Sequence, residues 1–182
     1  MPEIRKYLPK DKDNLRKICV ETTLIPLNDK TRAYIPILWN DYYTEQEPEN
    51  IFVLDDGGQA VGYIIAASSP DYFKKMRNIY LPKVKKISWY MALVFRIEML
   101  ADKKLYKKYG SHLHIDLLPP YQRGGWGSKL TDALLSRLKQ KGLNGVYLGT
   151  TEKNIKGVNF YRKYGFKQVR KIGENLTFAL TF

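Results

Sequence analysis

The glycine-rich segment from Pro119 to Ser128, PPYQRGGWGS, has the residue types and the spacing to bind an anion. It stands between an expected strand and an expected helix, so several backbone N–H groups would lie at the positive end of the helix dipole. The glycines let a phosphate approach the main chain, and Arg123 adds a positive charge. The segment has neither the Lys-Ser/Thr pair of a Walker loop nor the third glycine of the dinucleotide fingerprint, which makes ATP and NAD poor candidates.

Two side chains that can exchange protons, His114 and Asp116, lie just before this segment. Residues 112–118 alternate between apolar and polar side chains, which predicts a strand with one buried face and with both groups on the other face. Either group could act as a general base, directly or through water, or the two could form a hydrogen-bonded or exposed pair on a half-covered sheet. The chain has only two histidines, and its single cysteine, Cys19, excludes an internal disulfide and a zinc site of cysteine pairs, so we expect no metal site.

The elements that must position these groups follow from apolar periodicity and from turn residues. The expected helices are 11–22, 128–140 and 154–165, the last with Asn154 as its N-cap. The expected strands are 51–54, 60–67, 112–118, 146–150, 167–171 and 176–182. The first two strands are joined through Gly57 and Gly58, which supply the positive φ values of a tight hairpin turn.

Residues 71–110 form a Lys-rich segment between two of these strands, with a mostly apolar helical run from Ile87 to Leu100. We expect a helical insertion between the third and fourth strands of a single domain spanning residues 1–182, because so short a segment is small for an independent core. Its aromatic residues could line a substrate pocket, pack the insertion onto the domain or form a dimer contact.

The charge of this 182-residue chain is strongly positive and unevenly distributed. The net charge is +13, with −3 in residues 1–70 and +8 in each of the segments 71–110 and 111–182. Such an excess attracts phosphates, nucleic acids or acidic small molecules, although Lys-rich helix faces in solvent give the same count. The stretch from Asp41 to Asp56 holds six carboxylates and no basic group, and it could steer a cationic substrate.

The composition also limits where the protein acts. A hydrophobic fraction of 44% argues against a disordered chain. No segment reaches the roughly 18 uninterrupted apolar residues of a membrane helix, and the first residues lack the apolar stretch of an export signal. We therefore expect a cytoplasmic protein without a membrane partner.

Two blocks of the sequence resemble the GNAT acyltransferase superfamily. Residues 122–127, QRGGWG, are similar to the family's Q/R-x-x-G-x-G/A signature, and residues 154–166, NIKGVNFYRKYGF, are similar to its N-x-x-A/G-x-x-F-Y-x-K-x-G-F block. The order of the elements between the blocks also agrees. The resemblance implies an α/β (α+β) fold with a mixed, mostly antiparallel sheet that is flanked by helices and splayed between its fourth and fifth strands.

The resemblance also implies roles for individual residues. Acetyl-CoA would lie in the split of the sheet, with its pyrophosphate on the amides of the glycine-rich loop and its pantetheine arm along the fourth strand. The residues implied to contact the cofactor are Leu117, Leu118, Gln122, Arg123, Gly124, Gly125, Trp126, Gly127, Ser128 and Asn154. Tyr161 matches the family's usual general acid. Pro120, Gly124 and Trp126 depart from the residues that are common at their positions.

The function that this resemblance implies is acetyl transfer from acetyl-CoA to an amine by direct attack in a ternary complex. Two alternatives are a CoA-binding sensor or interaction module without catalysis and, with less support, a basic nucleic-acid-binding protein, since no nucleic-acid motif accompanies the basic residues. We expect no nucleic-acid partner, and a homodimer is possible. The acceptor amine and the general base stay open.

Overall fold

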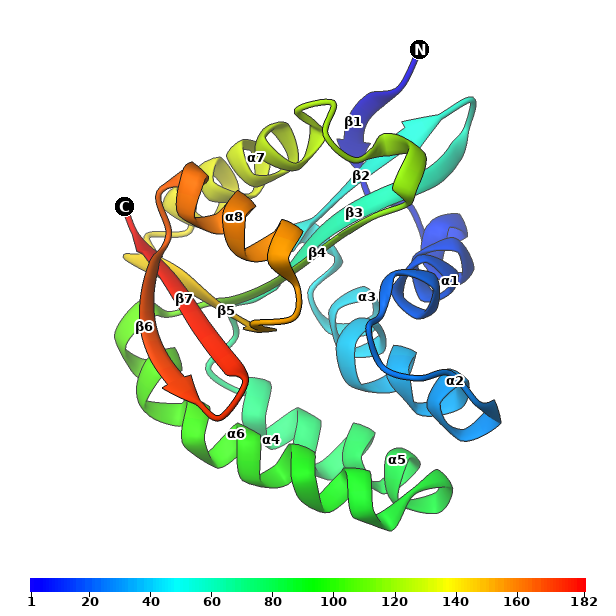
Figure 1. Cartoon of the computed structure of the whole chain (residues 1–182), viewed down its shortest axis with the longest axis vertical. Coiled ribbons are helices and arrows are strands. Elements are labelled where there is room, and N and C mark those ends of the chain that lie inside the picture. Colours follow the sequence, from blue (N-terminus) through cyan, green and yellow to red (C-terminus); the bar gives the residue numbers. More distant parts are fainter.

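The computed structural model describes all 182 residues and contains one seven-stranded sheet (Figure 1). Its strands are β1 Glu3–Lys6, β2 Ile51–Asp56, β3 Gln59–Ala67, β4 His112–Leu117, β5 Gly145–Thr151, β6 Lys167–Ile172 and β7 Asn175–Thr181. Their order is β1-β2-β3-β4-β5-β7-β6, and all neighbours are antiparallel except β4 and β5. The expected mixed, mostly antiparallel sheet is confirmed.

The sheet is split between β4 and β5. These two parallel strands share a single residue pair, His112 with Tyr147, whereas β3 and β4 are paired along six positions. From that pair onward the strands diverge, so the rest of β4 has one edge without a partner strand. The expected splay between the fourth and fifth strands is therefore present, and it opens toward the end of β4 that leads into the glycine-rich segment.

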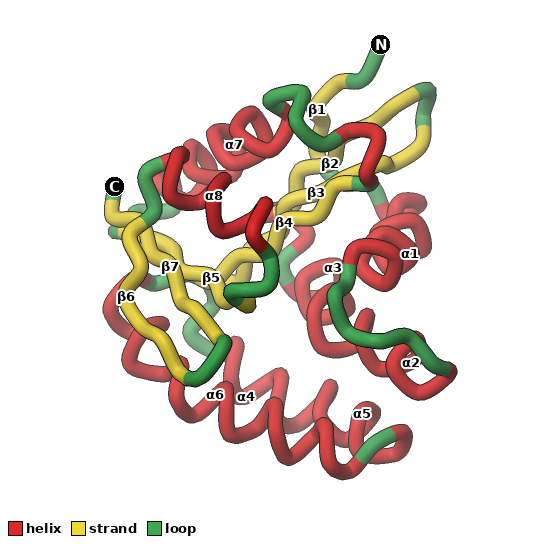
Figure 2. The backbone as a smooth tube through the Cα atoms, in the orientation of Figure 1, coloured by secondary structure: helices red, strands yellow, loops and turns green.

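Helices cover both faces of the sheet (Figure 2). The face of α7 (Trp126–Gln140) and α8 (Ile155–Tyr164) shares a core that includes Ile64 and Leu134. The other face shares a core with α1 (Lys12–Thr22), α2 (Asp29–Pro36), α3 (Tyr42–Gln46) and the insertion. Because successive side chains of a strand point to opposite faces, Tyr63 and Ile65 of β3 belong to this second core.

The segment between α1 and β2 is helical, although its apolar pattern predicts no element. Asn28 caps α2 by accepting a hydrogen bond from the Thr31 N–H at 3.0 Å. Pro36 lies inside the helix and is followed by a π turn, Ile37–Asp41, which leads into α3. Burial of Leu38, Tyr42 and Tyr43 holds this interrupted helix against the sheet.

The insertion consists of α4 (Tyr72–Lys75), a π turn (Met76–Tyr80), α5 (Leu81–Ile87) and the long helix α6 (Trp89–Tyr109). The single helical run expected from Ile87 is broken at Ser88, whose hydroxyl caps α6 by accepting from the Met91 N–H at 3.3 Å. The aromatic residues Tyr72, Tyr80 and Phe95 are buried in the same core as α1 and α3. They therefore pack the insertion onto the domain, and α6 crosses beneath β5 and β7 (Figure 1).

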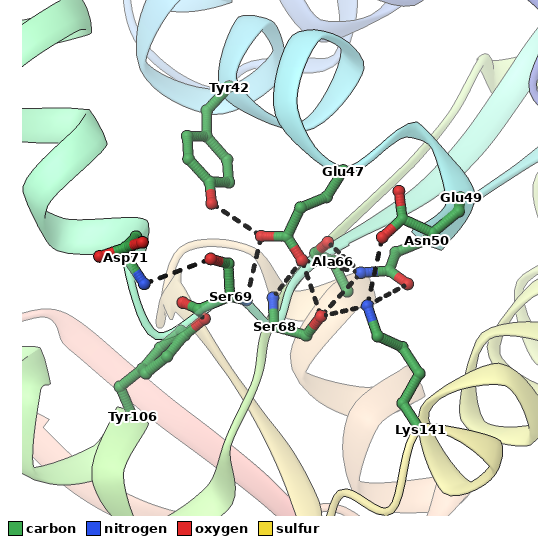
Figure 3. A network of polar contacts seen from close by, with 10 residues as sticks. All are labelled: Tyr42, Glu47, Glu49, Asn50, Ala66, Ser68, Ser69, Asp71, Tyr106 and Lys141. Atoms are coloured by element: carbon green, nitrogen blue, oxygen red, sulfur yellow. Dashed lines mark hydrogen bonds and ion pairs between the residues drawn. The ribbon is translucent and has the colours of Figure 1, made fainter.

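A buried polar network fixes the start of the insertion to the end of β3 (Figure 3). At its centre, the Glu47 carboxylate accepts hydrogen bonds from the Tyr42 hydroxyl at 2.7 Å and from the Ser68 N–H and hydroxyl at 2.8 and 2.7 Å. The Ser68 hydroxyl also accepts a hydrogen bond from the Lys141 ammonium at 2.8 Å. The contacts join the α3–β2 junction, the beginning of the insertion and the end of α7.

None of the helices combines the length and apolarity required to cross a bilayer.

Candidate functional site

The glycine-rich loop presents unbonded backbone N–H groups at the beginning of α7. Arg123 has φ 66° and Gly125 has φ 79°, so the chain turns sharply through left-handed conformations before the helix starts. No side chain caps α7, and the first helical bond runs from the Lys129 N–H to the Gly125 carbonyl at 3.2 Å. The preceding N–H groups of the first turn are therefore free to bind an anion.

The loop is held against α8 by close contact at Gly127. A Cβ atom at this position would lie 3.2 Å from the Phe160 ring, which is tighter than ordinary van der Waals contact. The Lys129 ammonium lies 4.3 Å from the centre of the Trp126 ring, a cation–π contact at the mouth of the loop. The two signature blocks of the sequence thus contact each other in space.

The open edge of β4 ends at this loop, and its main-chain groups alternate in direction. The Leu118 N–H donates to the Val61 carbonyl at 3.0 Å, and the Leu118 carbonyl accepts from the Tyr121 N–H at 2.9 Å. Both groups of Leu118 thus have partners within the protein, and its contact with the pantetheine arm stays a prediction. By the alternation of a strand, the main-chain groups of Ile115 and Leu117 point to the split instead. The Leu117 carbonyl accepts a hydrogen bond from the Gln122 side chain at 2.9 Å.

The face of β4 that carries Asp116 is covered by α1, which also contacts the neighbouring strand β3. The Tyr63 hydroxyl, from the residue paired with Asp116 on β3, donates a hydrogen bond to the Asp116 carboxylate at 2.6 Å. Burial raises the pKa of Asp116, while hydrogen bonds from Tyr63 and Thr22 oppose that rise. The carboxyl group thus takes up a proton more readily than an exposed aspartate does.

The two histidines on the same face are kept neutral. Burial lowers the pKa of His112 to about 4, and its Nδ1 lies 3.0 Å from the Tyr43 hydroxyl. Burial and the neighbouring His112 lower the pKa of His114 well below its usual value. The Nε2 atom of His114 is buried and has no hydrogen-bond partner. His114 therefore offers a neutral imidazole beside Asp116.

Tyr161 lies on α8, in the core on the face of the sheet that α7 and α8 cover. Its ring is buried and packs against Phe166 and Phe178, with ring centres 5.8 Å away in each case. Burial raises the pKa of Tyr161, and the negative charge of Asp116 raises it further. The hydroxyl is thus protonated at neutral pH, and Asp116 is near enough for its charge to act on it.

Comparison with known proteins agrees with this geometry. The sequence profile of the Acetyltransferase (GNAT) family matches residues 13–166. The chain belongs to this family. It is a GNAT-type N-acetyltransferase, from a family whose members carry out acetyl transfer from acetyl-CoA.

Solved structures similar to this GNAT chain span its whole length. The crystal structure of SsHAT is 28% identical, with a TM-score of 0.86 over 99% of this chain and 98% of that one. Ard1 from Thermoplasma volcanium is 19% identical, with a TM-score of 0.64 over 99% and 97%. The paia N-acetyltransferase from Thermoplasma acidophilum, solved in complex with coenzyme A, is 16% identical, with a TM-score of 0.64 over 100% and 99%. The last two likenesses concern the fold.

Asn154 of the second GNAT block has a structural task in this chain. Its side chain accepts a hydrogen bond from the Gly157 N–H at 3.0 Å and donates one to the Thr150 hydroxyl at 3.2 Å. A Cβ at Gly157 would lie 2.4 Å from the Asn154 side chain, so this cap requires glycine there. Asn154 is therefore the N-cap of α8 that the sequence predicts, and its contact with a cofactor stays a prediction.

The sequence patterns gave no indication of Tyr63 as a member of this site. Tyr63 lies in a strand whose residues are almost all buried, so its position does not differ from that of the other core residues of the strand. Only the register that places Tyr63 opposite Asp116 shows its contact with the carboxylate. Cys19 lies in the same core, and burial raises the pKa of its thiol, as expected for a structural cysteine.

Proposed function

We propose that this GNAT enzyme transfers the acetyl group of acetyl-CoA to an amine by direct attack within a ternary complex. The single residue pair between β4 and β5 carries the proposal. It leaves the edge of β4 after His112 without a partner strand, next to Asp116 and the glycine-rich loop. The thioester would lie in this split. The acceptor amine would approach from the face of the sheet that bears Asp116.

The cofactor would be held mainly by main-chain groups. The free N–H groups around Gly125 and Gly127 would bind the pyrophosphate, with Arg123 contributing charge. The main-chain groups of Ile115 and the N–H of Leu117 would pair with the pantetheine arm as an added strand would, while the Gln122 side chain holds the carbonyl of Leu117. This part of the proposal is supported by the coenzyme A complex of the Thermoplasma acidophilum relative.

Asp116 is the proposed general base. An alkyl amine has a pKa of about 10, so it must lose a proton to become a nucleophile. The raised pKa of Asp116 suits it to accept that proton, directly or through one water molecule. Burial lowers the pKa of His114, so it takes up a proton less readily than an ordinary histidine, and we assign it a contact with the acceptor or with that water.

Tyr161 is the proposed general acid. The amine nitrogen forms a bond to the acetyl carbon, the carbon–sulfur bond breaks, and the departing thiolate of coenzyme A takes the hydroxyl proton of Tyr161. A raised pKa keeps that proton on Tyr161 until the thiolate forms. The surplus proton of the acetylated nitrogen restores the Tyr161 hydroxyl through solvent, and the proton taken by Asp116 returns to solvent, so thiol and amide form without a further reactant.

A CoA-release assay over a broad panel of amines tests the proposal, combined with Tyr161→Phe. We expect kcat to fall by about a hundredfold or more, with nearly unchanged affinity for coenzyme A, because only the proton donor is lost. Tyr164→Phe is the matched control on the same helix, since its hydroxyl contacts Asp132 outside the split.

An unchanged kcat in Tyr161→Phe would remove this residue from the mechanism. Tight binding of acetyl-CoA without turnover of any amine would instead support the sensor or interaction module. An acceptor found in this panel would also define the substrate class.

A further inference from the structure

A groove of about 730 Å³ lies within the insertion, between α6 and the segment formed by α4, the π turn and α5. Its apolar base includes the buried side chains of Leu81, Met99 and Tyr106. The groove is not part of the acetyl-transfer site. Ser68 and Gly110 on its wall flank the end of β3 and the start of β4, about 20 Å of strand away from the glycine-rich loop.

The groove is lined by five basic side chains and by no acidic one. These are Lys74, Arg77, Arg96, Lys103 and Lys107. None of them forms an ion pair, and the only hydrogen bond among them runs from the Arg77 guanidinium to the neighbouring Asn78 amide at 3.2 Å. Five unneutralised cations around one concavity favour a ligand with several negative charges.

An exposed apolar stripe continues from the groove along α6. Its side chains are Trp89, Leu93, Ile97 and Leu100, with exposed fractions of 68, 46, 59 and 55%. Their spacing of three and four residues places them on one helix face, and Leu100 also lines the groove. A contiguous exposed apolar stripe of this kind marks an interaction surface.

We propose that this groove and stripe bind an acidic amphipathic segment of a partner protein. Carboxylates of the segment would face the five basic side chains, and its apolar residues would contact the stripe and the base of the groove, as in the insertion of a helix into a groove. A second copy of this chain fits poorly, because the same surface would bring its own cations against those of the first copy. Binding there would leave the split of the sheet accessible.

The chemistry of the groove favours a peptide over a single-stranded nucleic acid. Such nucleic acids are held by aromatic rings on which bases stack, beside a basic path for the backbone. Tyr106, an aromatic residue of the groove, is buried and stacked on Tyr72, with ring centres 5.5 Å apart. Trp89 is the one exposed ring of the stripe, and the other three side chains are aliphatic, which suits the apolar face of an amphipathic helix better than a row of stacked bases.

Fluorescence anisotropy with a labelled synthetic helix tests the proposal. The basic side chains of α6 extend from Arg96 to Lys107, about 17 Å of helix, so a probe of about 16 residues spans them. The probe carries leucine on one face and glutamate elsewhere, and a second probe has glutamine in place of every glutamate. Labelled oligouridylate is the third probe. The protein is the full chain, as wild type, as Arg96→Glu/Lys103→Glu/Lys107→Glu and as Leu100→Ser.

We expect the acidic helix to bind the wild type at least about tenfold more tightly than the neutral helix and the oligouridylate do. The triple variant should lose at least about tenfold in affinity for it, and Leu100→Ser should also weaken binding. A control with the same change in charge, Lys10→Glu/Lys30→Glu/Lys167→Glu, reverses exposed lysines away from the groove and the stripe and should retain the affinity. Thermal unfolding should match the wild type in both triple variants, and acetyl-CoA binding should be equal in the two, because both lower the net charge by six units.

Three results would overturn the proposal. One is equal loss of binding in the groove variant and in the control, and another is equal binding of the acidic and neutral helices. The third is tighter binding of the oligouridylate with loss in the groove variant, which would assign the surface to nucleic acid. None of these depends on whether the split catalyses acetyl transfer.

Discussion

At the scale of single residues, the proposed chemistry depends on Asp116 and on what surrounds it. Burial raises the pKa of its carboxyl group, and the hydrogen bond from Tyr63 lowers it. The two effects act in opposite directions on the same proton. Removing one of them should therefore move the pH dependence of the enzyme in a direction that can be stated in advance.

Tyr63→Phe removes a donor that stabilises the ionised form of Asp116, so the pKa of Asp116 should rise. A base must be deprotonated to act, and kcat/KM therefore increases with pH through that pKa. The rising limb of the pH profile should shift to higher pH in Tyr63→Phe. Tyr43→Phe is the control, because its hydroxyl contacts His112 and not Asp116.

A rising limb that stays in place in Tyr63→Phe, or that moves to lower pH, contradicts the assignment of Asp116. If His114 were the base, the loss of the Tyr63 hydroxyl would not move the limb, because this hydroxyl donates to Asp116 and not to His114. Steady-state kinetics over the pH range in which both variants stay folded distinguish the two cases.

At the scale of elements, the Glu47 network determines how the insertion joins the sheet (Figure 3). Besides Tyr42 and Ser68, the carboxylate accepts hydrogen bonds from Asn50 at 3.0 Å and from the Ser69 N–H at 3.2 Å. Both oxygens therefore face donors. A side chain that offers a donor of its own at one of these positions cannot satisfy them all.

Glu47→Gln should lower the free energy of unfolding by about 2–4 kcal/mol, because its amide N–H₂ group would face donors in a buried site. Glu49→Gln is the control from the same turn. Its carboxylate is half exposed and contacts Lys141 at 3.2 Å, so it should cost less than about 1 kcal/mol. Urea unfolding of both variants measures the difference, and equal stabilities would show that the network does not anchor the insertion.

The elements also show which parts of the fold a sequence encodes locally. The strands β2 to β5 and the helices α7 and α8 follow from apolar periodicity and glycine positions, and Asn154 and Gly165 delimit α8 as predicted. The helices α2 and α3 do not follow from apolar periodicity, because Pro36 and a π turn interrupt the helical period. They are stabilised instead by the burial of Tyr42 and Tyr43 in the tertiary structure. Asp11 stands at the N-cap position of α1, but its carboxylate is paired with Arg5 of β1 and forms no capping hydrogen bond.

The candidate site divides in the same way. The glycine-rich loop and the shared face of His114 and Asp116 are local features, so the sequence predicts them. The engagement of Leu118 with Val61 and of Tyr63 with Asp116 depends on the register between β3 and β4. A one-residue change of register would exchange the faces of the strand, and nothing in the local pattern determines that choice.

At the scale of the whole molecule, the distribution of charge differs from what the count of residues indicates. Each of the six carboxylates between Asp41 and Asp56 has a partner within the protein. Four of them form ion pairs, Asp41 with Arg16, Glu45 with Lys12, Glu49 with Lys141 and Asp55 with Arg5. Glu47 accepts the hydrogen bonds of its network, and Asp56 accepts one from the Tyr121 hydroxyl. This stretch is therefore not a free acidic patch, and the hypothesis that it steers a cationic substrate loses its basis. The positive charge that is left uncompensated acts on anions.

The KM for acetyl-CoA should therefore rise with salt, because coenzyme A is a multivalent anion and ions screen its attraction to a chain of net charge +13. We expect a severalfold rise between about 0.05 and 0.5 M ionic strength, where the Debye length falls to a few ångströms. The KM for a cationic amine should stay level or fall. Initial-rate measurements in chloride and glutamate salts check this, and a salt-independent KM for acetyl-CoA would contradict it.

Calorimetric titration of coenzyme A tests most directly whether the loop before α7 holds the cofactor. Gly125 and Gly142 stand at the two ends of α7 with φ 79° and 74°, and a Cβ at either would meet nothing within 4 Å. Alanine should thus cost each site about 1–2 kcal/mol of backbone strain. In Gly125→Ala the free loop would relax to relieve the strain, and binding of coenzyme A would have to restore the strained conformation. Gly125→Ala should therefore raise the Kd about tenfold, while Gly142→Ala leaves it unchanged. Equal Kd values for both variants and the wild type, or no binding to the wild type, would contradict the site.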